Sequence, residues 1–331
     1  MDQLVVQLKN QLTKGAIAKY EAGEYLPRED KMRLLVEVLG VSEDYFYRTI
    51  NFEATVTSVR SKDMLTEREQ QMLAEEMLMT VERYLEVEQL VQGDDRPLLR
   101  KMDMVPLAEP DDAELAAEFW RLTWRAGEHV LGSVYALLEQ HGVVVHEMDS
   151  GIEFDGFSAY VNETIPVIVI NGNRNAERRR FTALHELAHL MLPFSEALSD
   201  KAIDKLCNRF AGAALMPAKI LKSILGKKRD SLYVEELVML RNSYGISISA
   251  LAHRALELGI ITAGTYARIR AALESNLLEE GLGAYEGKEH SCRLEAMTLR
   301  AVGQRLITQS KAAELLPLPG NELKNRLSNK W

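Results

Sequence analysis

The residues with the clearest chemical potential lie in one short stretch, His185-Glu186-x-x-His189. On a helix, side chains four positions apart lie on the same face, so His185 and His189 can bind one metal ion. Glu186 lies one step round the helix, close enough to polarise a water that the metal binds. Zinc (Zn2+) suits this arrangement, because a catalytic zinc takes three protein ligands and leaves one position for water.

The alternative interpretation of this stretch is a helix with two buried or solvated histidines. Apolar residues surround the motif on nearly every side, which predicts a buried helix; they are Leu184, Leu187, Ala188, Leu190, Met191 and Leu192. Two histidines and a carboxylate in a buried helix need polar partners, and a metal ion supplies them. Pro193 is expected to end the helix.

A third metal ligand is expected from the helical pattern that follows, over residues 200–217. Asp204 lies on the flank of its apolar stripe and faces a neighbouring helix. Asp200 and Glu196 are alternatives that periodicity alone does not separate. Cys207 is a candidate fourth ligand, although a cysteine at such a position is more often a small core residue. Four protein ligands would indicate a purely structural zinc site.

Two stretches around these residues resemble the ImmA/IrrE metallopeptidases. Residues 180–189 read R-F-T-A-L-H-E-L-A-H, where the family has R-F-T-x-x-H-E-x-x-H, and residues 208–217 read N-R-F-A-G-A-A-L-M-P, where the family has N-x-F-A-x-x-L-L-M-P. The resemblance covers residues 113–260. It implies that Asp204 is the acidic third ligand, at a position where the family usually has Glu, and that Glu186 is the catalytic base.

The segments before the motif predict a small sheet. A helix over 113–140 is followed by β-type runs at 142–148, 156–162 and 166–170, and then by the metal helix. This is the order of elements in zincins. The predicted fold is therefore mainly α with a small β-sheet, an α+β zincin-like metallopeptidase core.

In zincins, an edge strand beside the metal helix pairs with extended substrate. By resemblance, this substrate strand contains Phe157, Ser158, Ala159 and Val161. Tyr160 in the same strand could stabilise the tetrahedral intermediate, with an ordinary strand tyrosine as the alternative.

The 331 residues are long enough for several domains. We expect a helix-turn-helix domain over 1–50, a helical linker or strut over 51–112, the zincin-like core over 113–220 and a C-terminal helical region over 221–331. Within these, residues 51–65 read as a polar linker. The Gly- and Glu-rich stretch from 279 to 291 reads as a mobile segment, and the arginines at 178–180 as a solvated or structural charge run.

The first fifty residues resemble the Xre/Cro-type helix-turn-helix, through the stretches 13–23 and 39–46. The resemblance implies that the helix starting at Thr13 reads DNA, with Thr13, Lys14 and Gly15 facing bases and Lys19 facing phosphates. The family has another helix before this motif, so a start upstream of Met1 or an incomplete domain is expected.

Charge does not favour this DNA-binding prediction, because residues 1–50 contain seven Lys/Arg and eight Asp/Glu. The alternative is a small helical domain that binds protein or only dimerises. The net charge of −9 speaks against a surface that coats nucleic acid generally, but it does not exclude one local helix that reads DNA. No apolar run has membrane-spanning length, and two distant cysteines fit a reducing cytoplasm.

These features predict a cytoplasmic zinc endopeptidase tethered to a DNA-binding domain. The resemblance implies a regulatory protein substrate, namely a transcriptional repressor. The alternative is a DNA-binding regulator or antitoxin with a toxin partner, in which the peptidase fold is weakly active or inactive. A homodimer is expected, because helix-turn-helix proteins usually act as dimers.

Overall fold

The computed structural model of the protein describes residues 11–21, 25–39, 65–92, 97–274 and 281–316, the backbone of 54–60, and the single positions 5, 8, 276, 279 and 326. The chain divides into two compact units, Met1–Phe52 and Glu53–Trp331. The three segments predicted separately after residue 50 thus lie in one unit. Helices predominate, and a four-stranded sheet lies in the second unit, which confirms the predicted fold class.

In the first unit, helices α2 (Lys14–Glu21) and α3 (Glu29–Leu39) enclose a small apolar core. The core is formed by Leu8, Leu12, Ile17 and Leu35. The backbone N–H of Ala16 donates to Thr13 Oγ1 at 3.2 Å, so Thr13 caps α2. The stretch at 39–46 that resembles the helix-turn-helix family lies, beyond its first residue, outside the described residues.

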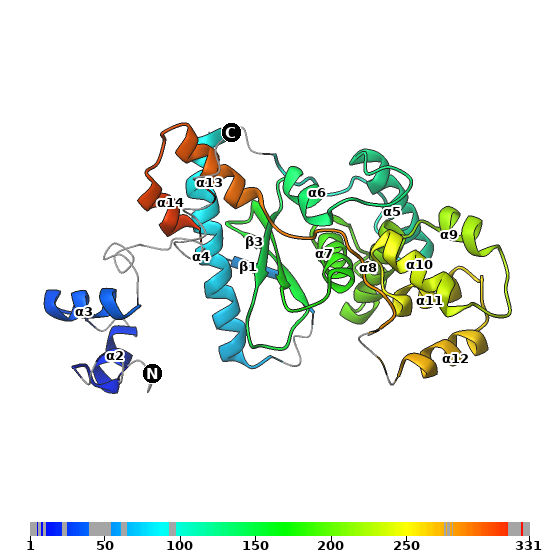
Figure 1. Ribbon diagram of the computed structural model, residues 1–331, viewed down its shortest axis with the longest axis horizontal. Coiled ribbons are helices and arrows are strands. Elements are labelled where there is room, and N and C mark those ends of the chain that lie inside the picture. Colours follow the sequence, from blue (N-terminus) through cyan, green and yellow to red (C-terminus); the bar gives the residue numbers. More distant parts are fainter. Residues whose placement is uncertain are drawn as a thin grey trace. The chain divides into compact units, whose positions relative to one another are not determined.

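The sheet of the second unit has the strand order β1-β3-β4-β2. Its strands are β1 (Ala54–Arg60), β2 (Val144–Met148), β3 (Gly156–Val161) and β4 (Ile165–Asn171). β3 is antiparallel to both β1 and β4, and β2 is parallel to β4. Every residue of β4 is buried, as expected for an inner strand covered on both faces. The sheet lies between helices α4 and α7 (Figure 1).

Strand β1 corrects two predictions. Residues 51–65 were expected to form a polar linker, yet residues 54–60 pair along the whole of β3. β3 was expected to be an edge strand, yet β1 occupies its outer side. The pattern Ala-Thr-Val-Thr-Ser-Val-Arg contains only two large apolar residues, so it shows little strand signal by itself.

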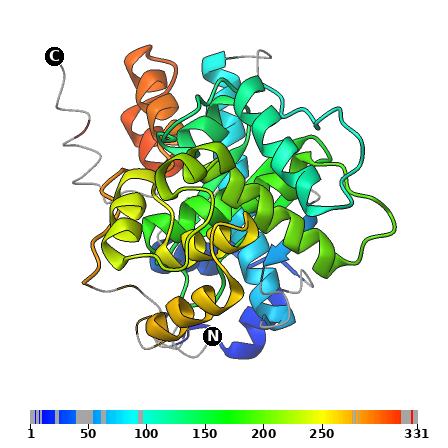
Figure 2. The ribbon, with the colours of Figure 1, turned by 90° about the vertical axis from the view of Figure 1, so that its right-hand side faces the viewer.

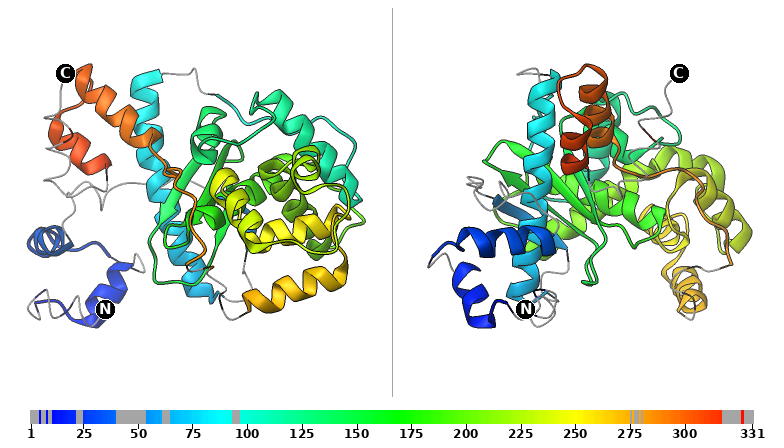
Figure 3. Two further views of the ribbon diagram at one scale, coloured as in Figure 1. Left: turned by 45° about the vertical axis from the view of Figure 1, so that its right-hand side comes forward. Right: turned by 60° about the vertical axis from the view of Figure 1, so that its left-hand side comes forward.

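Helix α4 (Glu67–Gln92) begins at a capping box formed by Thr66 and Glu69. The N–H and the hydroxyl of Thr66 donate to Glu69 Oε2 at 2.8 and 2.7 Å. Helices α13 (Arg293–Gly303) and α14 (Gln309–Leu315) pack beside α4, as both views of Figure 3 show. None of the helices in the described part of the chain combines the length and apolar character needed to cross a bilayer.

The long helix predicted over 113–140 is two helices, α5 (Pro110–Thr123) and α6 (Val134–Gln140). Between them Gly127 has a φ of 78°, a conformation that favours glycine. The guanidinium of Arg121 turns into this loop and donates to the carbonyls of Gly127 and Ala214 at 3.0 and 2.6 Å. Burial lowers the pKa of Arg121 to about 10.

The remaining helices form a layer on the α7 side of the sheet, which faces the viewer in Figure 2. They are α8 (Asp200–Leu215), α9 (Ala218–Leu225), α10 (Val234–Tyr244), α11 (Ile248–Glu257) and α12 (Ala263–Leu273). α8 packs between α5 and α7. This layer shares one apolar core with the inner face of the sheet.

Residues 281–291 form a segment that we call the strap. A mobile segment was predicted here, but the strap is held at its end by a buried ion pair. Arg180 Nη1 lies 2.6 Å from Glu289 Oε2, and both side chains are fully buried. Glu289 Oε1 also accepts a hydrogen bond from the N–H of Tyr135 at 2.7 Å, at the start of α6. The strap therefore joins α6 to the metal helix α7.

The other two arginines of the charge run are also paired, which supports the structural interpretation of that run. Arg178 Nη2 lies 2.6 Å from Asp155 Oδ2, and Arg179 Nη1 lies 2.5 Å from Glu147 Oε2.

Replacing Glu289 by Gln is expected to lower the free energy of unfolding by about 3–5 kcal/mol, because it leaves the buried charge of Arg180 unpaired. Urea unfolding of the full chain measures the change. Glu286→Gln is the matched control, since Glu286 lies on the same strap but is exposed. Equal effects of the two substitutions would show that the strap does not depend on this ion pair.

Candidate metal centre

Helix α7 (Ala176–Met191) is buried along most of its length. It begins after Asn175, whose side chain accepts a hydrogen bond from the N–H of Arg178 at 2.9 Å. It ends before Pro193, as predicted. Strands β3 and β4 pack on one side of the helix and α8 packs on another. His185 and Glu186 therefore lie in the interior with no exposed surface.

Three of the predicted site residues converge. His185 Nε2 lies 3.2 Å from Asp204 Oδ1 and 3.2 Å from His189 Nε2. The ligand atoms of these three side chains all lie within 4.8 Å of one another. Among the described residues, no other group of three His, Cys, Asp or Glu side chains comes together in this way.

The alternative ligands lie elsewhere in the structure. Glu196 and Asp200 are not members of the cluster, although both are described. Cys207 is fully buried in the apolar core, as expected for a small core residue. Asp204, one methylene shorter than the Glu of the family pattern, still brings an oxygen to hydrogen-bonding distance of His185.

Asn208 orients two members of the cluster, and sequence reasoning missed this role. Its side-chain N–H donates to Asp204 Oδ2 at 3.1 Å, which turns its carbonyl oxygen Oδ1 towards His185 Nδ1, 3.1 Å away. His185 must then carry its proton on Nδ1, so its Nε2 presents a lone pair to the cluster. The available signal was the spacing, because Asn208 lies one helical turn after Asp204.

The donor set fits a divalent metal ion. Two imidazole nitrogens and a carboxylate oxygen that face one another are mutually repulsive acceptors unless a cation or a proton lies between them. Two His and one carboxylate are also a known ligand set of catalytic zinc sites. The side chain of Asp204 is 47% exposed, so the cluster opens to solvent on the α8 side.

Strand β3 contacts the functional face of α7 through alternate residues. Ser158 Oγ donates to Glu186 Oε2 at 2.9 Å, and both side chains are fully buried. Two residues later, the hydroxyl of Tyr160 donates to the carbonyl of Leu190 at 2.9 Å, and burial raises the pKa of this hydroxyl. The predicted catalytic role of Tyr160 stays a prediction, because this contact is one that an ordinary strand tyrosine makes.

The other residues of the predicted substrate strand are also buried. Side chains alternate along a strand, so Phe157, Ala159 and Val161 point away from the face that carries Ser158. Their backbone pairs with β4 on one side and with β1 on the other.

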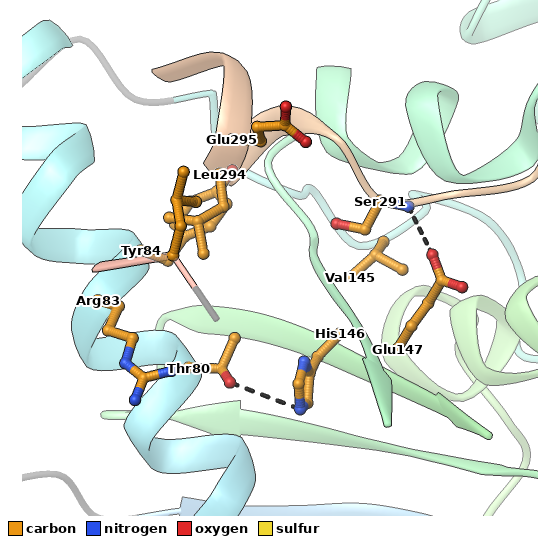
Figure 4. A pocket seen from close by; sticks show the side chains of 10 residues that line it. Thr80, Arg83, Tyr84, Val145, His146, Glu147, Ser291, Leu294 and Glu295 are labelled. Carbon is orange, nitrogen blue, oxygen red and sulfur yellow. Dashed lines mark hydrogen bonds between the residues drawn. The ribbon is translucent and has the colours of Figure 1, made fainter. Parts of the chain in front are cut away.

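A separate hollow of about 190 Å³ lies between α4, β2 and the start of α13 (Figure 4). Its polar groups contact one another. Thr80 Oγ1 lies 3.5 Å from His146 Nε2, and the N–H of Ser291 donates to Glu147 Oε1 at 2.7 Å. This hollow lies on the α4 side of the sheet, and none of its lining residues belongs to the metal cluster.

Comparison with known proteins agrees with this geometry. Residues 138–256 match the peptidase M78 family, described as an IrrE N-terminal-like domain. A stretch of 71 residues is 39% identical to the radiation response metalloprotease IrrE of Deinococcus deserti. That match covers 18% of this chain and 25% of the relative, so the chain spans about a quarter of the relative's length. The matches point to a metallopeptidase domain of the ImmA/IrrE type.

Replacing Asn208 by Ala is expected to weaken metal binding by about 10- to 100-fold, because the ring of His185 and the carboxylate of Asp204 lose their orienting partner. Competitive titration of the apoprotein against a chromophoric chelator measures the affinity. Lys205→Ala, an exposed position on the same helix, is the control. Unchanged affinity in the Asn208 variant would contradict the orienting role.

Proposed function

We propose that the protein is a zinc-dependent endopeptidase that cleaves a regulatory protein, with a transcriptional repressor as the expected substrate class. The observation that carries the proposal is the convergence of His185, His189 and Asp204 beside the buried carboxylate of Glu186. The match to a peptidase family over residues 138–256 supports it. Two cysteines, with Cys207 buried in the core and Cys292 outside any disulfide, are compatible with the cytoplasm as its location.

The residues of the site have different roles in hydrolysis. A zinc ion held by His185, His189 and Asp204 would supply Lewis acidity and lower the pKa of water. Glu186 accepts the proton of the attacking water and passes it to the amine nitrogen of the leaving peptide. Ser158 holds one carboxylate oxygen of Glu186, which keeps the other oxygen directed at the reacting atoms.

We also propose that the first unit binds DNA through the start of α2, and that it does so as a homodimer. Thr13, Lys14 and Gly15 are exposed there, and a Cβ added at Gly15 would meet no atom of the described residues within 4 Å. This surface is therefore open to a ligand. Lys19 Nζ lies 5.4 Å from the ring centroid of Tyr25, which orders the side chain that we assign to a phosphate.

A second candidate function is a DNA-binding regulator or antitoxin that holds a toxin partner and has little peptidase turnover. The observation that favours it is β1, which covers the β3 edge where extended substrate was expected to pair. Substitutions at Lys14 and at Glu186 distinguish the two functions. Repression of the operon should need Lys14 but not Glu186, whereas cleavage in solution should need Glu186 but not Lys14.

Replacing Glu186 by Gln is expected to lower the rate of repressor cleavage by about 100-fold or more, because the general base is lost. Zinc content should stay near one per chain, since the metal ligands are intact. Candidate repressors incubated with purified protein and resolved by intact mass give the readout. Glu163→Gln, on the exposed turn after β3, is the control. A repressor that is cut equally well by the Glu186 variant would refute the assignment.

Replacing Ser158 by Ala is expected to lower kcat about tenfold and to leave KM and zinc content unchanged. The hydroxyl contacts Glu186 rather than substrate, so its loss should act on the chemical step. Steady-state kinetics on a cleaved repressor separate the two parameters. A rise in KM at constant kcat would instead show that β3 was displaced.

A further inference from the structure

The outer edge of β3 is already filled by a segment of the same chain. β1 pairs with β3 through six residue pairs, from Ala54 opposite Val161 to Arg60 opposite Gly156. β4 occupies the other side of β3. Because each side of a strand can hydrogen-bond to only one neighbour, an extended polypeptide cannot pair with β3 while β1 is in place.

The register places β1 beside the functional residues. Ser58 lies opposite Ser158, the residue that contacts Glu186. Between Val56 and Ser58 the register shifts, so Thr57 is an extra, bulged residue at this point. β1 also lies against α7. An antiparallel strand therefore already pairs with the residue of β3 that contacts the proposed general base.

β1 has the fewest large apolar residues of the four strands. Its seven residues include only two large apolar ones, Val56 and Val59, whereas β4 reads Ile-Pro-Val-Ile-Val-Ile-Asn and is buried throughout. The bulge interrupts its ladder with β3. Like β2 it has only one strand neighbour, and the boundary between the two compact units falls just before it, after Phe52.

We infer that β1 is an exchangeable occupant of the β3 edge, and that an extended polypeptide binds beside the metal cluster by taking its place. This inference rests on the proposed function and names its regulation. The substrate segment would be an extended, proline-free stretch that pairs antiparallel with β3, as residues 54–60 do. Any interaction that separates β1 from β3 would make this edge of β3 accessible to substrate.

The test locks β1 with a reversible disulfide. Ala54 and Val161 are partners in an antiparallel ladder, where Cα separations of about 4.5–5.5 Å suit a disulfide. Ala54→Cys and Val161→Cys are combined with Cys292→Ser, which removes the exposed thiol, and with Glu186→Gln, which prevents turnover. A second variant of the full chain replaces residues 54–60 by Gly and Ser.

The probe is a fluorescein-labelled synthetic peptide with the sequence of residues 53–61, and its binding is followed by anisotropy. The Gly/Ser variant should bind it at least tenfold more tightly than the oxidised, locked protein. Reduction should restore measurable binding, although weaker than in the Gly/Ser variant, because the tethered β1 competes at an effective concentration of about millimolar. Equal binding by the oxidised and reduced forms would overturn the inference, and this comparison holds even where the Gly/Ser variant does not fold.

Repeating the comparison with Glu186 intact and zinc added separates the inference from the proposed function. Binding that depends on the lock, without cleavage of the probe or of any repressor, would support strand exchange and refute the peptidase. Cleavage at the same rate by locked and unlocked protein would support the peptidase and refute strand exchange.

Discussion

The strongly polar groups that helix α7 carries into a mainly apolar interior include Arg180, His185 and Glu186. Burial of such groups is costly unless each finds a hydrogen-bonding or charged partner. The partners come from three different parts of the chain: Glu289 of the strap, Asn208 of α8 and Ser158 of β3. The same contacts that make the burial of α7 possible therefore also fix the strap, α8 and β3 around the metal cluster.

Local patterns predicted the parts of the site that lie on one helix. His185, Glu186 and His189 follow from helical spacing, and the end of their helix follows from Pro193. Asp204 was named through the family resemblance, and the structure places its carboxylate beside the histidines. Asn208 was missed because its role depends on a residue of another helix, although its spacing from Asp204 was visible.

Distant pairing explains the two largest differences between prediction and structure. β1 has only two large apolar residues, Val56 and Val59, which do not alternate, and its partner β3 begins nearly a hundred positions later, so their pairing is not visible locally. The strap reads as a mobile segment because glycine and glutamate are typical of solvated chain. Glu289 is nevertheless buried against Arg180, which lies 109 positions earlier. Composition cannot show which acidic residue will meet a buried arginine.

The ion pair between the strap and helix α7 can form only late in the synthesis of the chain, because its two partners lie far apart in sequence. A ribosome adds about 5–20 residues per second, so the 109 positions that separate Arg180 from Glu289 correspond to about 5–20 s of translation. During that interval helix α7 has been synthesised, but the charge of Arg180 near its start lacks its partner Glu289. The cluster-bearing helix can reach its final packing only after most of the chain has been made. A chain that ends before residue 289 would leave the buried charge of Arg180 without its partner, so we expect its motif helix to be packed less stably.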